Sequence, residues 1–241
     1  GADYGALTGL FRSEVARVTV LDEAQEALET VRLRYPSAKN IDYVQKSLEE
    51  YAPEAPAMYD YVVIAGQGKA LCRQEAEAAK RLLKPTGILI AAVPNTLGMK
   101  YWAGTKREEN GLTKAQLQSM LCGEAGFLRF YYPMPDYRTP ISIYSDEYLP
   151  KKGDLTRVIP AYDYPRYHVT DMGEGFDIVC QDGLFDLYAN SYLVFWSADE
   201  ERLKRQSQRI YIKYNKTRRE EFQIKTCICR KEGAERLGNQ D

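Results

Sequence analysis

Short apolar segments alternate with longer amphipathic segments over the first 95 residues of the chain. The apolar segments have the length of buried strands and cover residues 16–21, 41–45, 59–65 and 88–93. Between them, residues 24–35 and 71–83 have the pattern of helices, each followed by a proline that ends it. This alternation predicts repeated strand–helix units and a parallel sheet.

The pattern changes after Asn95, where residues 96–111 form a polar loop. Residues 113–123 predict a helix capped by Thr113, and residues 127–132 and 187–196 predict two further strands. Strands in this late part, after a series of strand–helix units, favour an antiparallel edge on the parallel sheet. We therefore expect an α/β fold with a mostly parallel seven-stranded sheet, an antiparallel edge strand and flanking helices.

The last forty residues are more charged than the rest. Residues 210–214 and 222–229 predict a hairpin, so we divide the chain into a main domain, 1–200, and an appendage, 201–241. The appendage is either such a hairpin or the start of a second domain. Its basic residues between 202 and 219 are interleaved with glutamates, which favours a solvated face over contact with RNA.

Composition adds several negative expectations. The 33 basic and 34 acidic side chains give a net charge of −1, so no overall field favours a nucleic-acid partner. No apolar run approaches the roughly 18 residues of a membrane-spanning helix. Five scattered cysteines make a disulfide framework improbable, and a single histidine makes a zinc site unusual. We expect a cytoplasmic, metal-free protein without a membrane segment.

The chain opens on a glycine-containing loop, Gly1-Ala2-Asp3-Tyr4-Gly5-Ala6-Leu7-Thr8-Gly9. Glycine at a strand-to-helix turn lets the backbone approach a ligand, and the next helix offers free N–H groups to it. Asp22 follows the next predicted strand, where a carboxylate can accept hydrogen bonds from two ribose hydroxyls. Loop and acid together predict a site for a cofactor that contains a nucleoside.

The spacing separates two classes of cofactor. A dinucleotide fingerprint needs glycines at relative positions one, three and six, which here hold Gly1, Asp3 and Ala6. An aspartate beside a pyrophosphate would be repelled, whereas a methyl donor without phosphate tolerates it. The loop therefore favours a methyl donor over a nicotinamide dinucleotide.

With these features, the sequence resembles class I S-adenosylmethionine-dependent methyltransferases over residues 1–197. The stretches that carry the resemblance are the opening loop, Val-Thr-Val-Leu-Asp at 18–22, Tyr-Asp-Tyr-Val-Val-Ile at 59–64, Leu-Leu-Lys-Pro-Thr-Gly-Ile-Leu-Ile at 82–90, and the helix ending in Glu-Ala-Gly-Phe at 124–127. The resemblance implies a Rossmann-like fold and S-adenosylmethionine as the cofactor. In this fold a strand precedes the glycine loop, so we expect the first strand of the sheet to lie upstream of Gly1.

The resemblance also implies which residues hold the cofactor. Gly1, Ala2, Asp3 and Gly5 would line its methionine part. Asp22 would hold the ribose with Glu23 beside it, and Ser47 and Leu48 would meet the adenine. Gly66 and Gln67 would border the sulfonium. The sequence departs from the family pattern at Asp3, which replaces a glycine, and at Ser47, where an aspartate is common.

A narrower resemblance covers residues 95–104, 131–137, 143–150 and 189–193. These stretches are similar to bacterial methyltransferases of surface-polysaccharide biosynthesis, some of which are fused to further domains. The resemblance implies a small-molecule or glycan acceptor, with a hydroxyl as the methylated group.

A hydroxyl acceptor needs a base to take its proton. The candidates are His168 and Asp146, followed by Glu147 and Asp136; His168, the single histidine, titrates near neutral pH. A lone histidine is also a common structural residue, and Asp146-Glu147 is equally well explained as a helix cap.

The loop after the strand at 88–93 lies where parallel sheets bind ligands. Asn95, Tyr101 and Trp102, together with Lys100, would form a substrate wall or lid. The alternative is that the two aromatic rings simply pack the loop against the protein.

Two other functions remain open. One is a non-catalytic scaffold that keeps a degenerate cofactor site for a partner, which the departures at Asp3 and Ser47 would explain. The other is RNA methylation, which predicts binding that weakens steeply with salt.

Overall fold

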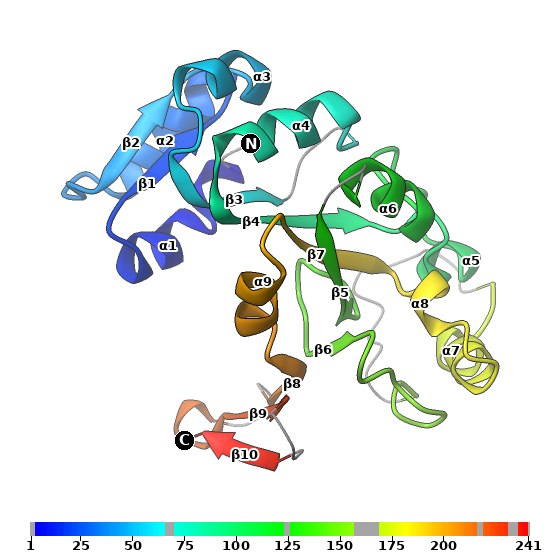
Figure 1. Ribbon diagram of the computed structural model, residues 1–241. Helices are drawn as coiled ribbons and strands as arrows, with labels where there is room; N and C mark the ends of the chain where they lie inside the picture. The colour runs from blue at the N-terminus through cyan, green and yellow to red at the C-terminus, as the bar shows by residue number, and fades with distance from the viewer. Residues whose placement is uncertain are drawn as a thin grey trace.

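The computed structural model describes residues 3–65, 70–122, 126–156, 169–215, 219–230 and 236–240. The described strands form two sheets (Figure 1). A two-stranded sheet contains β1 and β2, and an eight-stranded sheet has the order β10-β9-β8-β6-β5-β7-β4-β3. Among the described helices, none combines the length and apolar character needed to span a bilayer.

The N-terminal unit consists of a parallel strand pair and two helices. Strands β1 (Val18–Leu21) and β2 (Ile41–Val44) pair in parallel, and α1 (Thr8–Glu14) and α2 (Gln25–Arg34) accompany them. A short 3-10 helix, Asp3–Gly5, precedes α1. The unit has its own small core, made of Val20, Leu28, Val31 and Ile41.

The next unit contains the single parallel pair among the described strands of the large sheet. Strand β3 (Tyr59–Ala65) pairs with β4 (Leu83–Pro94), and α4 (Arg73–Leu82) covers them. The small helices α3 (Leu48–Tyr51) and Ala52–Glu54 precede β3. The buried alanines of α4 let the helix approach the sheet and α3 closely.

Strand β7 (Ser191–Ser197) lies between β4 and β5 (Phe127–Met134) and is antiparallel to both. Because β7 is antiparallel to both of its neighbours, β4 and β5 run in the same direction and end at the same edge of the sheet. On one face lie α4 and α6 (Lys114–Cys122), and on the other lies α9 (Glu200–Gln206) (Figure 1). The short α5 (Met99–Trp102), α7 (Met172–Gln181) and α8 (Phe185–Tyr188) lie together beyond the ends of these strands.

The C-terminal strands continue the large sheet. Strand β6 (Ser142–Ser145) joins β5 to β8 (Arg209–Asn215), which is followed by the 3-10 helix Glu220–Phe222, β9 (Ile224–Cys229) and β10 (Arg236–Gln240). The hairpin expected over 210–229 is present as β8 and β9. The expected boundary after residue 200 falls within the first turn of α9, which packs on β7, β5 and β4. The division into two domains stays a prediction.

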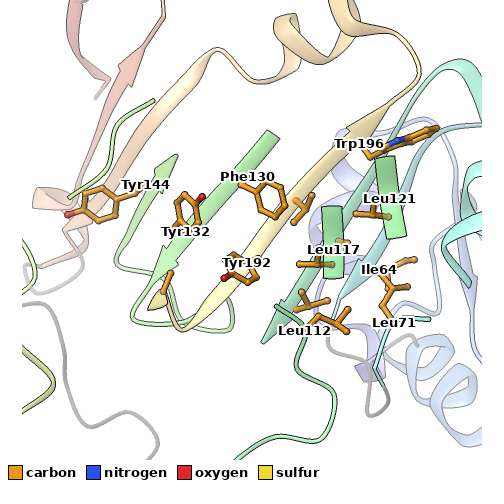
Figure 2. Close-up of a cluster of buried hydrophobic side chains, with 14 of the residues drawn as sticks. Ile64, Leu71, Leu112, Leu117, Leu121, Phe130, Tyr132, Tyr144, Tyr192 and Trp196 are labelled. Atoms are coloured by element: carbon orange, nitrogen blue, oxygen red, sulfur yellow. The ribbon is translucent and has the colours of Figure 1, made fainter. Parts of the chain in front are cut away.

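The main core runs along the sheet on the α4–α6 face. Figure 2 shows it extending from Ile64 and Leu71, through Leu117 and Leu121 of α6, to the aromatic side chains around Tyr132. The rings of Tyr132 and Phe185 meet edge to face at 5.6 Å, as do those of Phe130 and Tyr192 at 5.8 Å. These contacts pack β5 against both β7 and α8.

The α/β fold with helices on both faces is confirmed, but the large sheet is mixed rather than mostly parallel. Strand β7 is antiparallel and internal, not at an edge, and every described pair beyond it is antiparallel as well. The expected strand at 187–196 begins only at Ser191, because residues 185–188 form α8. A short apolar run does not distinguish a strand from a buried helical turn.

The two sheets lie side by side without backbone pairing between β1 and β3. Within the described residues no strand lies between them. The Tyr59 hydroxyl donates to Thr19 Oγ1 at 2.9 Å and lies 2.7 Å from the Tyr51 hydroxyl, so side chains connect the units here. An upstream first strand stays a prediction.

Candidate active site at one edge of the sheet

Asp22 lies directly after β1, at the carboxyl end of the strand. Its backbone N–H donates to the Val44 carbonyl at 3.2 Å, which continues the pairing of β1 with β2. Its Oδ1 accepts from the Ala24 N–H at 2.8 Å, just before α2 begins. These bonds fix a half-buried carboxylate at the edge where parallel sheets bind ligands.

The turn after β2 lies beside the turn that carries Asp22. Gln45 Nε2 donates to the Glu23 carbonyl at 3.4 Å and joins the two turns. Ser47 caps α3: its Oγ accepts from the Glu50 N–H at 3.2 Å, while Glu50 Oε2 accepts from the Ser47 N–H at 3.0 Å. The cap uses Ser47 Oγ as an acceptor and leaves its proton to donate.

The structure therefore brings Asp22, Glu23, Ser47 and Leu48 to one edge. Glu23 is exposed, and Leu48 is half-buried against the main core and against a small cluster formed by Ala52, Ala55, Ala78 and Leu82. A carboxylate that can accept from hydroxyls, beside a serine hydroxyl and an apolar side chain, is a donor set that fits a nucleoside. The roles of these four residues stay predictions.

Gly5, a described glycine of the predicted cofactor loop, packs against α2. Gly5 has a φ of +83°, and a Cβ at this position would lie 3.2 Å from Val31 in the second half of α2. The Gly5 carbonyl accepts from the Tyr35 hydroxyl at 3.2 Å. The nearest atoms to Gly5 thus belong to α2, not to Asp22 at the other end of that helix. Glycine is needed here for packing and for its positive φ.

Several predicted site residues lie outside the described residues. They are Gly1, Ala2, Gly66, Gln67 and His168, and the same holds for the side chain of Asp3. Their predicted contacts with the methionine part and the sulfonium, and the predicted role of His168 as a base, are not tested by the structure.

A small cavity lies at the carboxyl ends of β3 and β4. It measures about 10 Å³, which is enough for one water-sized group. Its apolar wall includes Ile64, Leu71 and Pro94, and its polar groups come from Asn110 and Tyr137. Figure 2 shows Ile64 and Leu71 together at this end of the core.

Asn95, expected to contact substrate, is fully buried after β4. Its Nδ2 donates to the Leu187 and Ala189 carbonyls, both at 2.7 Å, and its Oδ1 accepts from the Leu97 N–H at 3.0 Å. Both amide protons are used inside the protein. Asn95 thus anchors the following loop, and its predicted place in a substrate wall stays a prediction.

Tyr101 and Trp102 lie in α5, within that loop. The Tyr101 hydroxyl donates to Glu108 at 3.3 Å, and Lys100 Nζ lies 5.0 Å from the Tyr101 ring centre. Trp102 is 50% exposed, and its Nε1 donates to the Leu97 carbonyl at 3.3 Å. Trp102 is thus available at the surface, whereas Tyr101 is partly enclosed by charged groups.

A buried ion network lies beneath this loop. Lys100 Nζ donates to Asp136 Oδ2 at 2.9 Å and to Glu108 Oε1 at 2.7 Å. Arg138 contacts both oxygens of Glu108, with Nη1 to Oε1 at 3.2 Å. Burial lowers the pKa of Lys100, but the attraction of Asp136 and the hydrogen bonds of Glu108 outweigh this effect and raise it above its ordinary value. Lys100 is therefore charged at all physiological pH values.

The sequence suggests roles for Lys100 and Asp136 separately. It gives no signal that the two side chains pair, because 36 residues separate them. Glu108 and Arg138 are missed altogether. One usable signal is Pro-Asp-Tyr at 135–137, which directly follows the end of β5 at the same edge of the sheet.

Asp146 belongs to a second charge cluster. Lys114 Nζ lies 2.9 Å from Asp146, 2.8 Å from Asp186 and 2.7 Å from the Tyr132 hydroxyl, which also donates to Asp146. Burial, and then the neighbouring Asp146, raises the pKa of Tyr132 far above its ordinary value. Glu147 pairs with Arg230. The Asp146 contacts are typical of a structural cluster, and its role as a base stays a prediction.

The family model described as a methyltransferase domain matches residues 1–91. These residues are similar to methyltransferase domains. The match spans β1 to β3 and most of β4, including Asp22 and the turn at Ser47. The nucleoside-type donor set around Asp22 lies within the matched residues, and a methyl donor that contains a nucleoside would fit it.

Curated relatives agree with this result. The chain is 33% identical over 105 residues to a ubiquinone biosynthesis O-methyltransferase of Klebsiella pneumoniae, and 36% identical over 105 residues to that of Erwinia tasmaniensis. Each match covers 42% of this chain and 43% of the relative. The chain thus spans less than half the length of the curated relatives it matches.

Solved structures show the same fold. A chain of the complex between the Haloferax volcanii Trm112 methyltransferase activator and its methyltransferase has a TM-score of 0.52 at 16% identity, over 83% of this chain and 80% of that one. A structure from work on thioacetal formation in echinomycin biosynthesis has a TM-score of 0.50 at 10% identity, over 86% of this chain and 77% of that one. Both extend well beyond residue 91, so the likeness in fold includes the later strands.

Proposed function

We propose that this protein transfers a methyl group from S-adenosylmethionine to a hydroxyl group of a small-molecule acceptor. The observation that carries the proposal is the match to a methyltransferase domain over residues 1–91, with Asp22 at the carboxyl end of β1. The curated relatives are O-methyltransferases, which supports a hydroxyl acceptor.

The bound cofactor supplies an electrophilic methyl group. The protein must hold the nucleoside, align the acceptor oxygen and exclude water. In this proposal Asp22 accepts from the ribose hydroxyls, Ser47 donates to the adenine, and Leu48 covers the base. The acceptor enters at the carboxyl ends of β3 and β4, beside Trp102 and the small cavity. Its proton leaves to a base, for which His168 and Asp146 stay candidates.

The relatives favour a small molecule over a glycan, so an association with surface polysaccharides stays a hypothesis. The second candidate function is a non-catalytic scaffold. The placement of Gly5 against Val31 and Tyr35, away from Asp22, is the observation that favours it.

Methyl-labelled S-adenosylmethionine separates these functions. The protein would be incubated with the label and a bacterial extract, and the products divided into a low-mass fraction and a polysaccharide fraction. We expect base-stable label, as in a methyl ether, in the low-mass fraction. Label in the polysaccharide fraction would support the glycan hypothesis, and binding of the methyl donor without transfer would support the scaffold.

A further inference from the structure

Tyr137 lies where the small cavity meets the buried ion network. It lines the cavity together with Asn110 and Pro94. Its backbone N–H donates to Ser191 Oγ at 2.9 Å, which ties it to the first residue of β7. Within the described part of the chain, no hydrogen-bond partner of its hydroxyl is found. The backbone of Tyr137 is thus fixed beside the cavity that the residue lines.

The two neighbours of Tyr137 in the chain both belong to the ion network. Asp136 is fully buried and bound to Lys100, and its Oδ1 accepts from the Arg138 N–H at 3.1 Å. The guanidinium of Arg138 lies 4.8 Å from the Tyr137 ring centre while it binds Glu108. The ring therefore contacts Arg138, and Glu108 and Asp136 fix the place of Arg138.

The burial of the Lys100–Asp136 ion pair is energetically unfavourable by itself. Removing Lys100 and Asp136 from water is costly, and a buried ion pair often adds no stability over apolar side chains of similar size. A network of this kind does, however, fix the geometry of the groups attached to it. The group attached here is Tyr137, at the end of β5, together with the loop that carries Tyr101 and Trp102.

We propose that Tyr137 binds the acceptor at the reacting oxygen, and that Lys100, Glu108, Asp136 and Arg138 act as positioning residues for Tyr137. This inference rests on the proposed function. It makes Tyr137 a specificity-determining residue, since Tyr137 is one of the two polar residues that line an otherwise apolar cavity.

The charges indicate the class of acceptor. Among the described residues, the network contains two cations and two carboxylates, whose charges offset one another. The rest of the cavity wall is apolar. A charged group beside the reacting oxygen would lose its hydration without gaining a counter-ion. The acceptor is therefore a neutral hydroxyl on an apolar framework, rather than a carboxylated or phosphorylated compound.

The test uses the full chain with labelled S-adenosylmethionine and the low-mass extract fraction, titrated by dilution, as the probe. Tyr137→Phe removes only the hydroxyl, and Tyr148→Phe, at an exposed tyrosine in another part of the sheet, is the matched control. We expect Tyr137→Phe to raise the apparent KM for the fraction about tenfold, as the loss of one hydrogen bond does. The Kd for S-adenosylhomocysteine is expected to stay unchanged.

Arg138 tests the positioning role, because it is half-exposed and its loss does not empty the core. Arg138→Met is expected to raise the same KM, and Arg138→Lys to restore part of it. An unchanged KM in Tyr137→Phe, with active wild-type protein, overturns the inference alone. A wild-type protein that binds no methyl donor overturns the proposed function instead. Equal loss in Arg138→Met and Arg138→Lys, with an altered Kd for S-adenosylhomocysteine, rejects the positioning role.

Discussion

The ammonium group of Lys100 lies 2.9 Å from the carboxylate of Asp136, and neither side chain is more than 1% exposed. Lys100 follows β4 and Asp136 follows β5, so the ion pair connects the two strand ends at the edge of the sheet. The pair thereby links the loop that carries Tyr101 and Trp102 to the segment that carries Tyr137.

Removal of the Lys100 ammonium should be strongly destabilising. Lys100→Met leaves Asp136 and Glu108 without their shared cation, and breaking a buried pair in this way costs about 3–5 kcal/mol. Lys84→Met breaks an exposed pair with Asp60 and should cost less than about 1 kcal/mol. Urea unfolding of both variants measures the difference. Equal costs would show that the network does not hold this edge together.

Glu108 should make stability depend on pH in the acid range. Burial raises the pKa of Glu108, but hydrogen bonds from Arg138 and Lys100 outweigh it and lower the pKa to about 2. The folded pKa is lower than the unfolded pKa of 4.5, so this stabilisation is present above pH 4.5 and is lost as the pH falls toward 2.

Between pH 6 and pH 3 the wild-type protein should lose about 2 kcal/mol more than Glu108→Gln, whose side chain does not titrate. The measurement is the free energy of unfolding in urea at the two pH values. Parallel losses in the two proteins would contradict the assignment.

Asp146→Asn distinguishes a structural role from a catalytic one. The variant weakens the contacts of Lys114 and Tyr132, and we expect a loss of about 1–3 kcal/mol in unfolding free energy. If the cluster is structural, the rate of methyl transfer per folded molecule changes less than about threefold. A fall of about 100-fold or more, with folding intact, would identify Asp146 as the base.

Gly126 should not tolerate a side chain. Gly126 directly precedes β5 and has a φ of +135°. A Cβ at this position would lie 2.2 Å from Nε1 of Trp196 in β7. Gly153 also has a positive φ, +91°, but a Cβ there meets nothing within 4 Å. Gly126→Ala should therefore cost more than about 3 kcal/mol, and Gly153→Ala about 1 kcal/mol. Similar melting temperatures for the two variants would argue against this packing of Trp196.

The sequence predicts well those features that depend on neighbouring residues. The strands β1 to β4, the helices α2 and α4, and the placement of Asp22 after β1 all follow from local alternation. The Thr113 cap of α6 is another example, because its hydrogen bond with Gln116 lies within one turn.

Features that depend on distant residues could not be predicted in this way. Nothing local indicates that β7 inserts between β4 and β5, or that Asn95 turns inward to the Leu187 and Ala189 carbonyls. The pairing of Lys100 with Asp136 could not be predicted for the same reason, since the two residues are far apart in the sequence. Strand β6 is only four residues long and lies in a segment rich in prolines and tyrosines, so its sequence shows no alternation of apolar and polar residues that would predict a strand.

The central claim is that Asp22 belongs to a site for S-adenosylmethionine. Its most direct test is a calorimetric titration of S-adenosylhomocysteine into the wild-type protein and into Asp22→Asn. Asp60→Asn, at an exposed aspartate that is the second residue of β3 and pairs with Lys84, is the control. We predict micromolar binding by the wild-type and control proteins, weakened about 10- to 100-fold in Asp22→Asn by the loss of charged hydrogen bonds. Equal affinity in all three folded proteins would contradict the account.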